Sequence, residues 1–306
     1  LNMDFTLILI TKNRANIAKC LNSIYDNLEK LKFKLIIIDG NKNNLLKDQI
    51  KESTLRHHDI KIYKQKKDGF MRACFQSIGY VETKFFSFIY DDDVLSEYYY
   101  KMIISSTKGN MLTLGKGSVE SIEKNINFID PEIKECLSSK RLVDYYTFST
   151  FKKKNLPNSP ICSVFKSSIL TKWEKFLLHN CRNNRDYFNI LLKKNIGPDL
   201  LLYLMSLDEE FLINSTNTIM SKFSHHNNSM SVRYGSVSLI FGYLVTKILF
   251  FKSIYKKMSH TKRLKFKTYL IIQLFYVIIR NIIKKNNLNF KVFKISLKEI
   301  YNLIRL

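Results

Sequence analysis

The sequence predicts an α/β fold in which a mainly parallel sheet is flanked by helices and followed by a helical C-terminal extension. Two observations indicate the sheet: apolar runs alternate with stretches of helical periodicity in the N-terminal third, and a polar loop follows each apolar run. A third observation defines the extension, because strand patterns stop after about Arg233. The chain has 306 residues, of which 45% are apolar, so it can bury a full-sized core and is neither disordered nor a disulfide-stapled miniprotein.

The N-terminal third alternates four predicted strands with three predicted helices. The strands cover residues 5–10, 33–38, 60–63 and 85–90, and the helices cover 17–28, 45–55 and 70–81. The strands are almost continuously apolar, which is typical of strands buried on both faces. Right-handed crossovers between them predict a parallel sheet with helices on both sides.

The middle of the chain, up to about residue 232, gives a mixed pattern. We predict a helix over 96–107, a strand near 111–114, a helix after Pro131, a strand over 161–165 and a helix through Trp173. Gly197 and Pro198 then open a helix that runs to about Glu210. The proline lies in the first turn, where its missing N–H costs least.

The charge of the chain is unevenly distributed. Of the net charge of +24, +15 falls between Arg233 and Leu306, where sixteen Lys and Arg residues accompany one acidic residue, Glu299. We expect this segment to be the part that attracts an anionic partner.

Cysteine usage and the first residues indicate a cytoplasmic protein. The five cysteines are odd in number, widely spaced and without a CxxC pair, so neither a zinc site nor a disulfide framework is suggested. The chain enters an apolar run within five residues and lacks the pattern of an export signal.

Asp91, Asp92 and Asp93 directly follow the fourth apolar strand, and ligands of open α/β sheets bind at the carboxyl ends of strands. If strand geometry continues, Asp91 and Asp93 share one face, where two carboxylates repel each other unless a cation lies between them. A Mg²⁺-type ion held by one or two carboxylates, substrate phosphates and water fits this pattern. The alternative is a solvated acidic loop before the next helix. The preceding buried strand and βαβ series favour the metal site.

Polar residues also follow the other predicted strands. Because the carboxyl ends of parallel strands meet at one edge, we expect these loops to lie beside the aspartates. An aspartate there can accept a hydrogen bond from a ribose hydroxyl or a base N–H, and an arginine can bind a phosphate. The residues that together predict a nucleotide pocket are Thr11, Asn13, Arg14, Asp39, Gly69 and Arg72, with Asp91 and Asp92.

Five segments together resemble family 2 glycosyltransferases of the GT-A fold, which is a Rossmann-like nucleotide-binding fold. They are LILITKNRANIAKCLNSIY, LIIIDGN, DGFMRACFQSIGYVETKFFSFIYDDDVL, GPDLLLYLMSL and FSHHNNSMS, within residues 4–232. The aspartate triplet matches the family's DXD metal motif. The resemblance implies a catalytic domain over 1–232, with nucleotide-sugar binding in about 1–115 and the acceptor side in about 116–232. The helical region then covers 233–306.

The resemblance also implies a reaction and roles for particular residues. Such enzymes move a sugar from a nucleoside-diphosphate sugar to an acceptor hydroxyl, usually with inversion and with Mn²⁺ or Mg²⁺. It implies that Asp93, Asp91 and His226 are candidate metal ligands and that Asp199 is the candidate general base. The acceptor is expected to be a glycan or a lipid-linked glycan of a surface polysaccharide.

Other roles for these residues stay open at this point. Asp208, Glu209 and Glu210 are rival bases, or the solvated end of a helix. Asp199 could simply cap its helix, and His226 could lie in a surface loop.

Two uncharged, largely apolar segments in the C-terminal region, residues 235–246 and 268–279, are flanked by Lys and Arg. Twelve residues are too few to span about 30 Å of hydrocarbon as a helix. They predict short interfacial helices on an anionic inner-membrane surface. A helical subdomain packed on the catalytic body is the alternative.

Two further functions compete with sugar transfer. A phosphotransferase of the haloacid-dehalogenase type also uses DxD, but its strand comes near the domain start, whereas three βα units precede it here. A basic nucleic-acid-binding protein is the other, but long aliphatic stretches such as residues 270–272 interrupt the basic runs, so no nucleic acid is expected. We therefore predict a cytoplasmic glycosyltransferase that lies peripherally on the inner face of the cell membrane.

Overall fold

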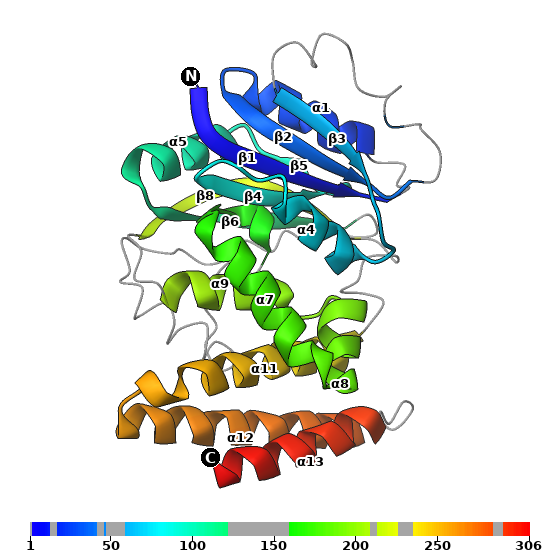
Figure 1. The fold of residues 1–306 in the computed structure, drawn as a ribbon, viewed down its shortest axis with the longest axis vertical. Coiled ribbons are helices and arrows are strands. Elements are labelled where there is room, and N and C mark those ends of the chain that lie inside the picture. Colours follow the sequence, from blue (N-terminus) through cyan, green and yellow to red (C-terminus); the bar gives the residue numbers. More distant parts are fainter. Residues whose placement is uncertain are drawn as a thin grey trace. The chain divides into compact units, whose positions relative to one another are not determined.

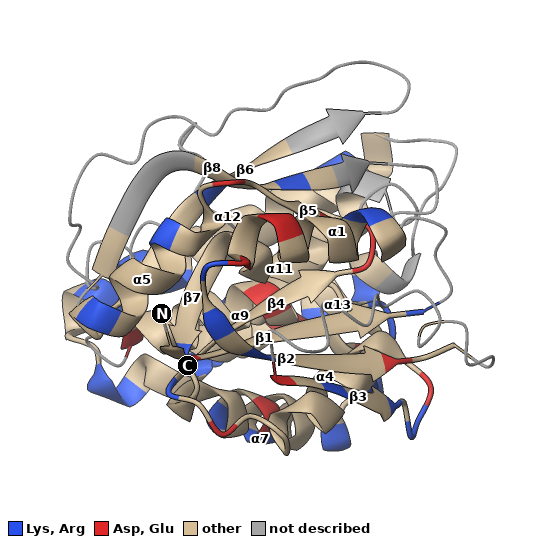
Figure 2. Ribbon diagram, turned by 90° about the horizontal axis from the view of Figure 1, so that it is seen from above, with Lys and Arg blue, Asp and Glu red and all other residues tan. Residues whose placement is uncertain are grey.

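The computed structural model describes residues 2–12, 17–41, 46, 59–121, 159–208, 213–225, 235–283 and 290–306. The chain forms two compact units. The first is built from Leu1–Glu174 and Met205–His226, and the second from Lys175–Leu204 and Asn227–Leu306. Lys and Arg residues are spread over helices and loops rather than gathered on one element (Figure 2).

The first unit contains a mixed sheet of eight described strands in the order β3-β2-β1-β4-β7-β6-β8-β5. Strands β3, β2, β1 and β4 are parallel, while β7 is antiparallel to β4 and β6. Strand β8 is parallel to β6 and antiparallel to β5. The bounds are β1 Asn2–Thr11, β2 Lys32–Asp39, β3 Asp59–Lys64, β4 Phe85–Tyr90, β5 Val94–Leu95, β6 Leu112–Ser121, β7 Ser163–Lys166 and β8 Ile213–His225.

Helices cover both faces of the parallel strands, as the almost continuous apolar runs predict. Helices α1 (Ile17–Leu28) and α5 (Tyr99–Gly109) pack on one face, and α4 (Phe70–Ile78) lies on the other (Figure 1). On the α4 side, Trp173 packs against Phe75 and Phe88, with ring centroids 5.6 and 6.3 Å apart. Trp173 belongs to α7 (Ser168–Arg182), which follows the short 3₁₀ turn η2 (Pro160–Cys162).

Most predicted elements of this unit are present. The four N-terminal strands and the helices after strands β1 and β3 are confirmed, and α5 and β6 begin within a few residues of their predicted positions. The predicted strand over 161–165 begins only at Ser163, because η2 occupies the residues before it. Strands β5 and β8 were not predicted. The helices expected over 45–55, apart from Leu46, and after Pro131 lie outside the described residues.

The second unit is helical in its described parts. Helix α11 packs against α12, and α12 packs against α13. Glu299 of α13 is 2% exposed and accepts hydrogen bonds from Tyr187 (2.6 Å) and from Lys252 of α11 (2.9 Å). The bounds are α8 Arg185–Tyr187, the π-helical turn η3 Phe188–Lys193, α9 Pro198–Asp208, α11 Gly235–Ile254, η4 Tyr255–Lys257, α12 His260–Ile283 and α13 Phe290–Arg305.

The C-terminal helices are longer than the sequence pattern predicts. Basic residues lie inside them, so α11 has 20 residues and α12 has 24 instead of twelve each. Both are long and apolar enough to cross a membrane by length and composition, but 61% of the α11 window and 44% of the α12 window are buried. Helix α11 is thus mostly buried in its unit, whereas less than half of the α12 window is buried.

Candidate active site

The carboxyl ends of β1, β2, β3 and β4 lie in one row at the same edge of the sheet. Thr11 at the end of β1 pairs with Asp39 of β2, and Asp39 pairs with Lys64 of β3. On the other side, Ile10 pairs with Tyr90 at the end of β4. The loops that leave these strands therefore start side by side, as predicted.

Asp91 connects the end of β4 to the end of β1. Its Oδ2 accepts a hydrogen bond from the Thr11 hydroxyl (3.0 Å) and another from the backbone N–H of Lys12 (2.8 Å). Asp91 is only 4% exposed. These two donors stabilise a carboxylate that would be costly to bury alone.

The aspartate triplet lies in a turn, so the expectation that strand geometry continues through it is wrong. The strand ends at Tyr90, whose carbonyl accepts the N–H of Asp93 (3.0 Å). The expected pairing of residues nevertheless holds in burial: Asp91 and Asp93 are 4% and 5% exposed, whereas Asp92 is half-buried.

The Cys20 thiol of α1 lies close to all three aspartates. Its Sγ donates to the Tyr90 carbonyl (3.4 Å). Burial raises the pKa of this thiol well above its ordinary value, and the carboxylates of Asp93, Asp91 and Asp92 raise it further, in that order.

The end of β2 supplies a third buried carboxylate, Asp39. Asp39 accepts the N–H of Asn41 (2.9 Å) and pairs with Lys64 Nζ (3.1 Å). The side-chain oxygen of Asn41, a residue 9% exposed, is buried and has no hydrogen-bond partner among the described residues. An unsatisfied acceptor of this kind is costly and calls for a donor from a ligand or water.

Gly40 allows β2 to end this close to β1. Its N–H donates to the Thr11 carbonyl (2.8 Å), and a Cβ on Gly40 would lie 3.1 Å from that same oxygen and against the Gln65 side chain. A larger residue would displace the end of the Gln65 side chain and press on the Thr11 carbonyl.

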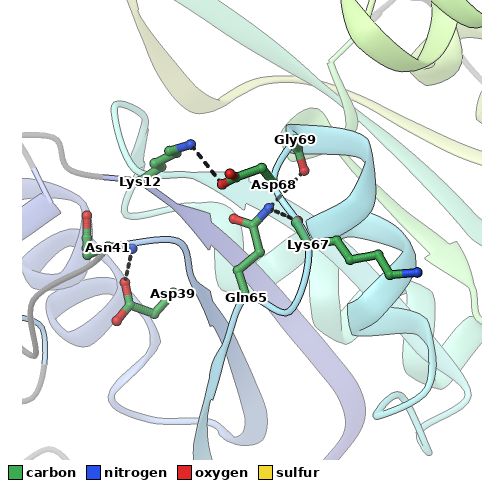
Figure 3. A network of polar contacts seen from close by, with 7 residues as sticks. All are labelled: Lys12, Asp39, Asn41, Gln65, Lys67, Asp68 and Gly69. Atoms are coloured by element: carbon green, nitrogen blue, oxygen red, sulfur yellow. Dashed lines mark hydrogen bonds and ion pairs between the residues drawn. The ribbon is translucent and has the colours of Figure 1, made fainter.

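The turn between β3 and α4 closes the same edge. Gln65 donates to the carbonyls of Lys67 (2.6 Å) and Gly69 (3.0 Å). Gly69 has a φ of 115°, which favours glycine. Figure 3 shows this network, in which Lys12 and Asp68 also point toward each other across a 3.4 Å ion pair. Both are exposed, so the pair adds less than about 1 kcal/mol.

Asp199 lies in the second unit, in the first turn of α9. Its Oδ1 accepts the N–H of Leu200 (2.9 Å), and the Tyr243 hydroxyl of α11 donates to its Oδ2 (3.3 Å). The side chain is partly exposed, yet burial raises the pKa of its carboxyl to about 6. Helix α9 starts at Pro198, so Asp199 lies inside the first turn, where its carboxylate accepts one of the backbone N–H groups that a helix start leaves free.

Close backbone packing brings Tyr243 to Asp199. Gly197 has a φ of 105°, and a Cβ there would collide with Thr246 and with the carbonyl of Gly242. A Cβ on Gly242 would in turn collide with Ile196. Both glycines let α11 run against the start of α9.

The residues present fit an open metal site rather than a closed one. Within the described ranges no group of three His, Cys, Asp or Glu residues could hold an ion. Asp91 and Asp93 alone offer two buried carboxylates, which is what a Mg²⁺-type ion needs when phosphates and water complete its shell.

Several candidates remain untested by the structure. Asn13, Arg14, His226, Glu209 and Glu210 lie outside the described residues. Asp208 is exposed at the end of α9, and Arg72 is exposed in the first turn of α4. The sequence reasoning missed Tyr243, which is 44 residues from Asp199. It placed the loop of Asp39, Gly40 and Asn41 at this edge but gave Asn41 no role of its own.

A sequence model of glycosyl transferase family 2 matches residues 6–173. This is more than half of the chain, so the chain belongs to that family and is a glycosyltransferase. Its mixed, mostly parallel sheet with a helical C-terminal region agrees with the predicted GT-A fold. No curated protein sequence matches the chain.

Solved structures of TarS from S. aureus resemble the fold. TarS 1-349 in complex with UDP-GlcNAc has a TM-score of 0.54 at 14% identity, with 89% of this chain and 81% of that chain covered. The complex with UDP gives 0.53 at 12% identity over 89% and 80%. A longer TarS structure gives 0.52 at 14% identity, covering 90% of this chain and 49% of that chain.

Proposed function

We propose that this glycosyltransferase moves a sugar from a UDP-sugar to a hydroxyl of a glycan or lipid-linked glycan, with inversion, in the synthesis of a surface polysaccharide. One observation carries the proposal. Three carboxylates that are each at most 5% exposed lie at one edge of the parallel sheet: Asp39 at the end of β2, and Asp91 and Asp93 just after β4, with the end of β1 between them. This is the edge at which α/β sheets bind nucleotides.

Uracil is the base that we propose for the donor nucleotide. The TarS structures of the same fold were obtained with UDP-GlcNAc and UDP. In the part of this chain that the structure describes, the buried Asn41 oxygen receives no hydrogen bond, and Asn41 is two residues beyond Asp39. A uracil N3–H is a donor that could satisfy such an acceptor.

Asp93, with Asp91, is the proposed holder of Mn²⁺ or Mg²⁺. When bound, such an ion neutralises the charge that grows on the leaving diphosphate.

Asp199 is the proposed general base. The acceptor oxygen attacks the anomeric carbon, its proton passes to the Asp199 carboxylate, and the bond from that carbon to the nucleoside diphosphate breaks. A base works best when its pKa lies near the working pH. With a pKa of about 6, Asp199 is mostly ionised at neutral pH yet more basic than an ordinary aspartate.

Family membership favours sugar transfer over the phosphotransferase alternative.

A cytoplasmic location is part of the same proposal, because nucleotide sugars are used there. Attachment to the inner membrane face is a separate inference.

A thermal-shift panel tests the site. UDP, GDP and UDP-GlcNAc would each be added with and without Mn²⁺, because a ligand at 100 times its Kd stabilises the fold by about 2.7 kcal/mol. We expect the largest Tm increase with UDP or UDP-GlcNAc plus Mn²⁺, and no metal-dependent increase in Asp93→Ala.

Asp68→Ala is the matched control, because it removes an exposed carboxylate from the same sheet edge. It should keep the metal-dependent increase. If wild type shows no nucleotide shift with Mn²⁺, or if Asp93→Ala keeps it, the proposed site is wrong.

A further inference from the structure

Helix α12 is apolar on two opposite sides. One side is buried in the second unit through Phe266, Leu270, Leu274 and Val277. The other side carries exposed large apolar residues at helical spacing: Leu264, Ile272, Phe275, Ile279, Ile282 and Ile283. At 100° per residue these six fall within about a third of the helix circumference, and they extend over about 28 Å of its length.

Helix α13 repeats the pattern on a smaller scale. Leu297, Tyr301 and Ile304 are exposed at spacings of four and three residues, opposite its buried side. Lys294, Lys298 and Arg305 are exposed next to them. We call the exposed apolar residues of α12 and α13 the outer stripe. Ile283 and Ile304 are 71% and 60% exposed. A single exposed apolar residue is normal on a protein surface, but a row of them indicates an interaction site.

Aromatic and basic side chains are paired along the outer stripe. Arg280 donates to the Tyr276 hydroxyl (3.0 Å) and lies 5.9 Å from the centre of that ring. Arg305 lies 4.7 Å from the ring centre of Tyr301. Such amphipathic pairs are typical of the boundary between lipid headgroups and acyl chains.

The charge of this region selects the partner. From Arg233 to Leu306 the single acidic residue is Glu299, which is buried and paired with Lys252. A second copy of the chain would place the same positive charge against itself, which opposes self-association. A nucleic acid would satisfy the charge but leave the large apolar side chains in water.

We propose that the outer stripe docks on a membrane leaflet that contains anionic phospholipid, with α12 and α13 lying along its surface. The apolar side chains enter the acyl boundary, while the flanking Lys and Arg residues meet the lipid phosphates. Helix α12 lies flat because its opposite side, including Gln273 and Asn281, is buried within the unit. This inference is independent of the reaction.

Co-sedimentation of the full chain with vesicles tests the inference. Phosphatidylcholine vesicles with and without phosphatidylglycerol would be compared at low and high salt. Wild type should bind the anionic vesicles, and added salt should weaken the binding. Ile272→Glu/Ile279→Glu should lower the affinity about tenfold or more, because two charges enter the apolar contact.

The double variant should fold like wild type, and its Tm checks this. Ile272 and Ile279 are about half exposed, so the substitutions bury no charge, and an unchanged Tm verifies folding. Lys19→Gln/Asn22→Glu on the exposed side of α1 lowers the net charge by the same two units and should bind within about twofold of wild type.

Three results would overturn the inference. Wild type could fail to bind anionic vesicles, or the double variant could bind as well as wild type. Alternatively, sedimentation velocity without lipid could show a dimer that the double variant abolishes, which would make the outer stripe a contact between copies. None of these results bears on nucleotide binding.

Discussion

The carboxylates at the sheet edge and the carboxylate at the start of α9 are held in different ways. Asp91 accepts from Thr11 and Lys12 of the neighbouring strand, and Asp39 accepts from Asn41 and pairs with Lys64. Asp199 accepts from its own neighbour Leu200 and, at a longer 3.3 Å, from one tyrosine.

The difference matches two kinds of chemistry. Hydrogen-bond donors that surround a carboxylate stabilise its ionised form and fix its orientation, which suits binding of a cation, a base or a ribose. A carboxylate whose desolvation outweighs its hydrogen bonds has a raised pKa and exchanges a proton near neutral pH. The comparison agrees with the proposed division, in which the sheet edge binds the donor and Asp199 at the start of α9 takes the proton.

The largest expected effect separates these two roles. Asp199→Asn removes the proton acceptor while keeping the size of the side chain, so kcat should fall about 10²- to 10⁴-fold. The Kd for UDP with Mn²⁺, measured by calorimetry, should stay within about twofold of wild type.

Asp208→Asn is the matched control, because it removes a carboxylate at the exposed end of the same helix. It should leave kcat nearly unchanged. If Asp199→Asn transfers sugar at close to the wild-type rate, or if Asp208→Asn is the inactive variant, the division of roles is wrong.

Gly40→Ala changes the sheet edge, so here we expect a change in UDP affinity, which Asp199→Asn should leave nearly unaltered. The added methyl group presses on the Thr11 carbonyl and Gln65, and overpacking of this kind costs about 1–3 kcal/mol. UDP affinity should fall about 10- to 100-fold, measured by calorimetry. Gly79→Ala is the control, because its Cβ would meet only an ordinary contact at 3.8 Å. Equal UDP affinity in both variants would show that the strand ends do not shape the pocket.

A smaller effect tests how Asp199 is tuned. Tyr243 donates to the ionised form of Asp199, so its hydroxyl lowers a pKa that burial has raised to about 6. Removing that hydroxyl in Tyr243→Phe should raise the pKa further. The acidic limb of the kcat/KM profile, where activity rises as Asp199 loses its proton, should move to higher pH by about one unit.

Tyr255→Phe removes another hydroxyl of the second unit, one that donates to the Leu306 carbonyl, and should leave the profile in place. An acidic limb that does not move in Tyr243→Phe would contradict the positioning role of this tyrosine.

The parallel half of the sheet could be predicted because buried strands consist of apolar runs, as in residues 33–38. The strands β5 and β8 at the other side of the sheet could not be predicted. Strand β8 reads INSTNTIMSKFSH, a polar stretch without an apolar run, and β5 has two residues. Asp39, Asp91 and Asp93 could be found because each follows an apolar strand. The turn at Asp91 and the contact of Tyr243 with Asp199 depend on tertiary packing, which leaves no local pattern.

Cys20 of α1, whose thiol donates to the Tyr90 carbonyl at the end of β4, offers a way to measure local opening at the sheet edge. Its thiol is enclosed and, with its raised pKa, stays protonated at physiological pH, so it is a poor nucleophile where it lies. A thiol reagent could reach it only when α1 lifts from the strands. The rate at which a thiol reagent labels Cys20 would therefore report how often α1 opens locally from the sheet, without any sugar, nucleotide or acceptor present.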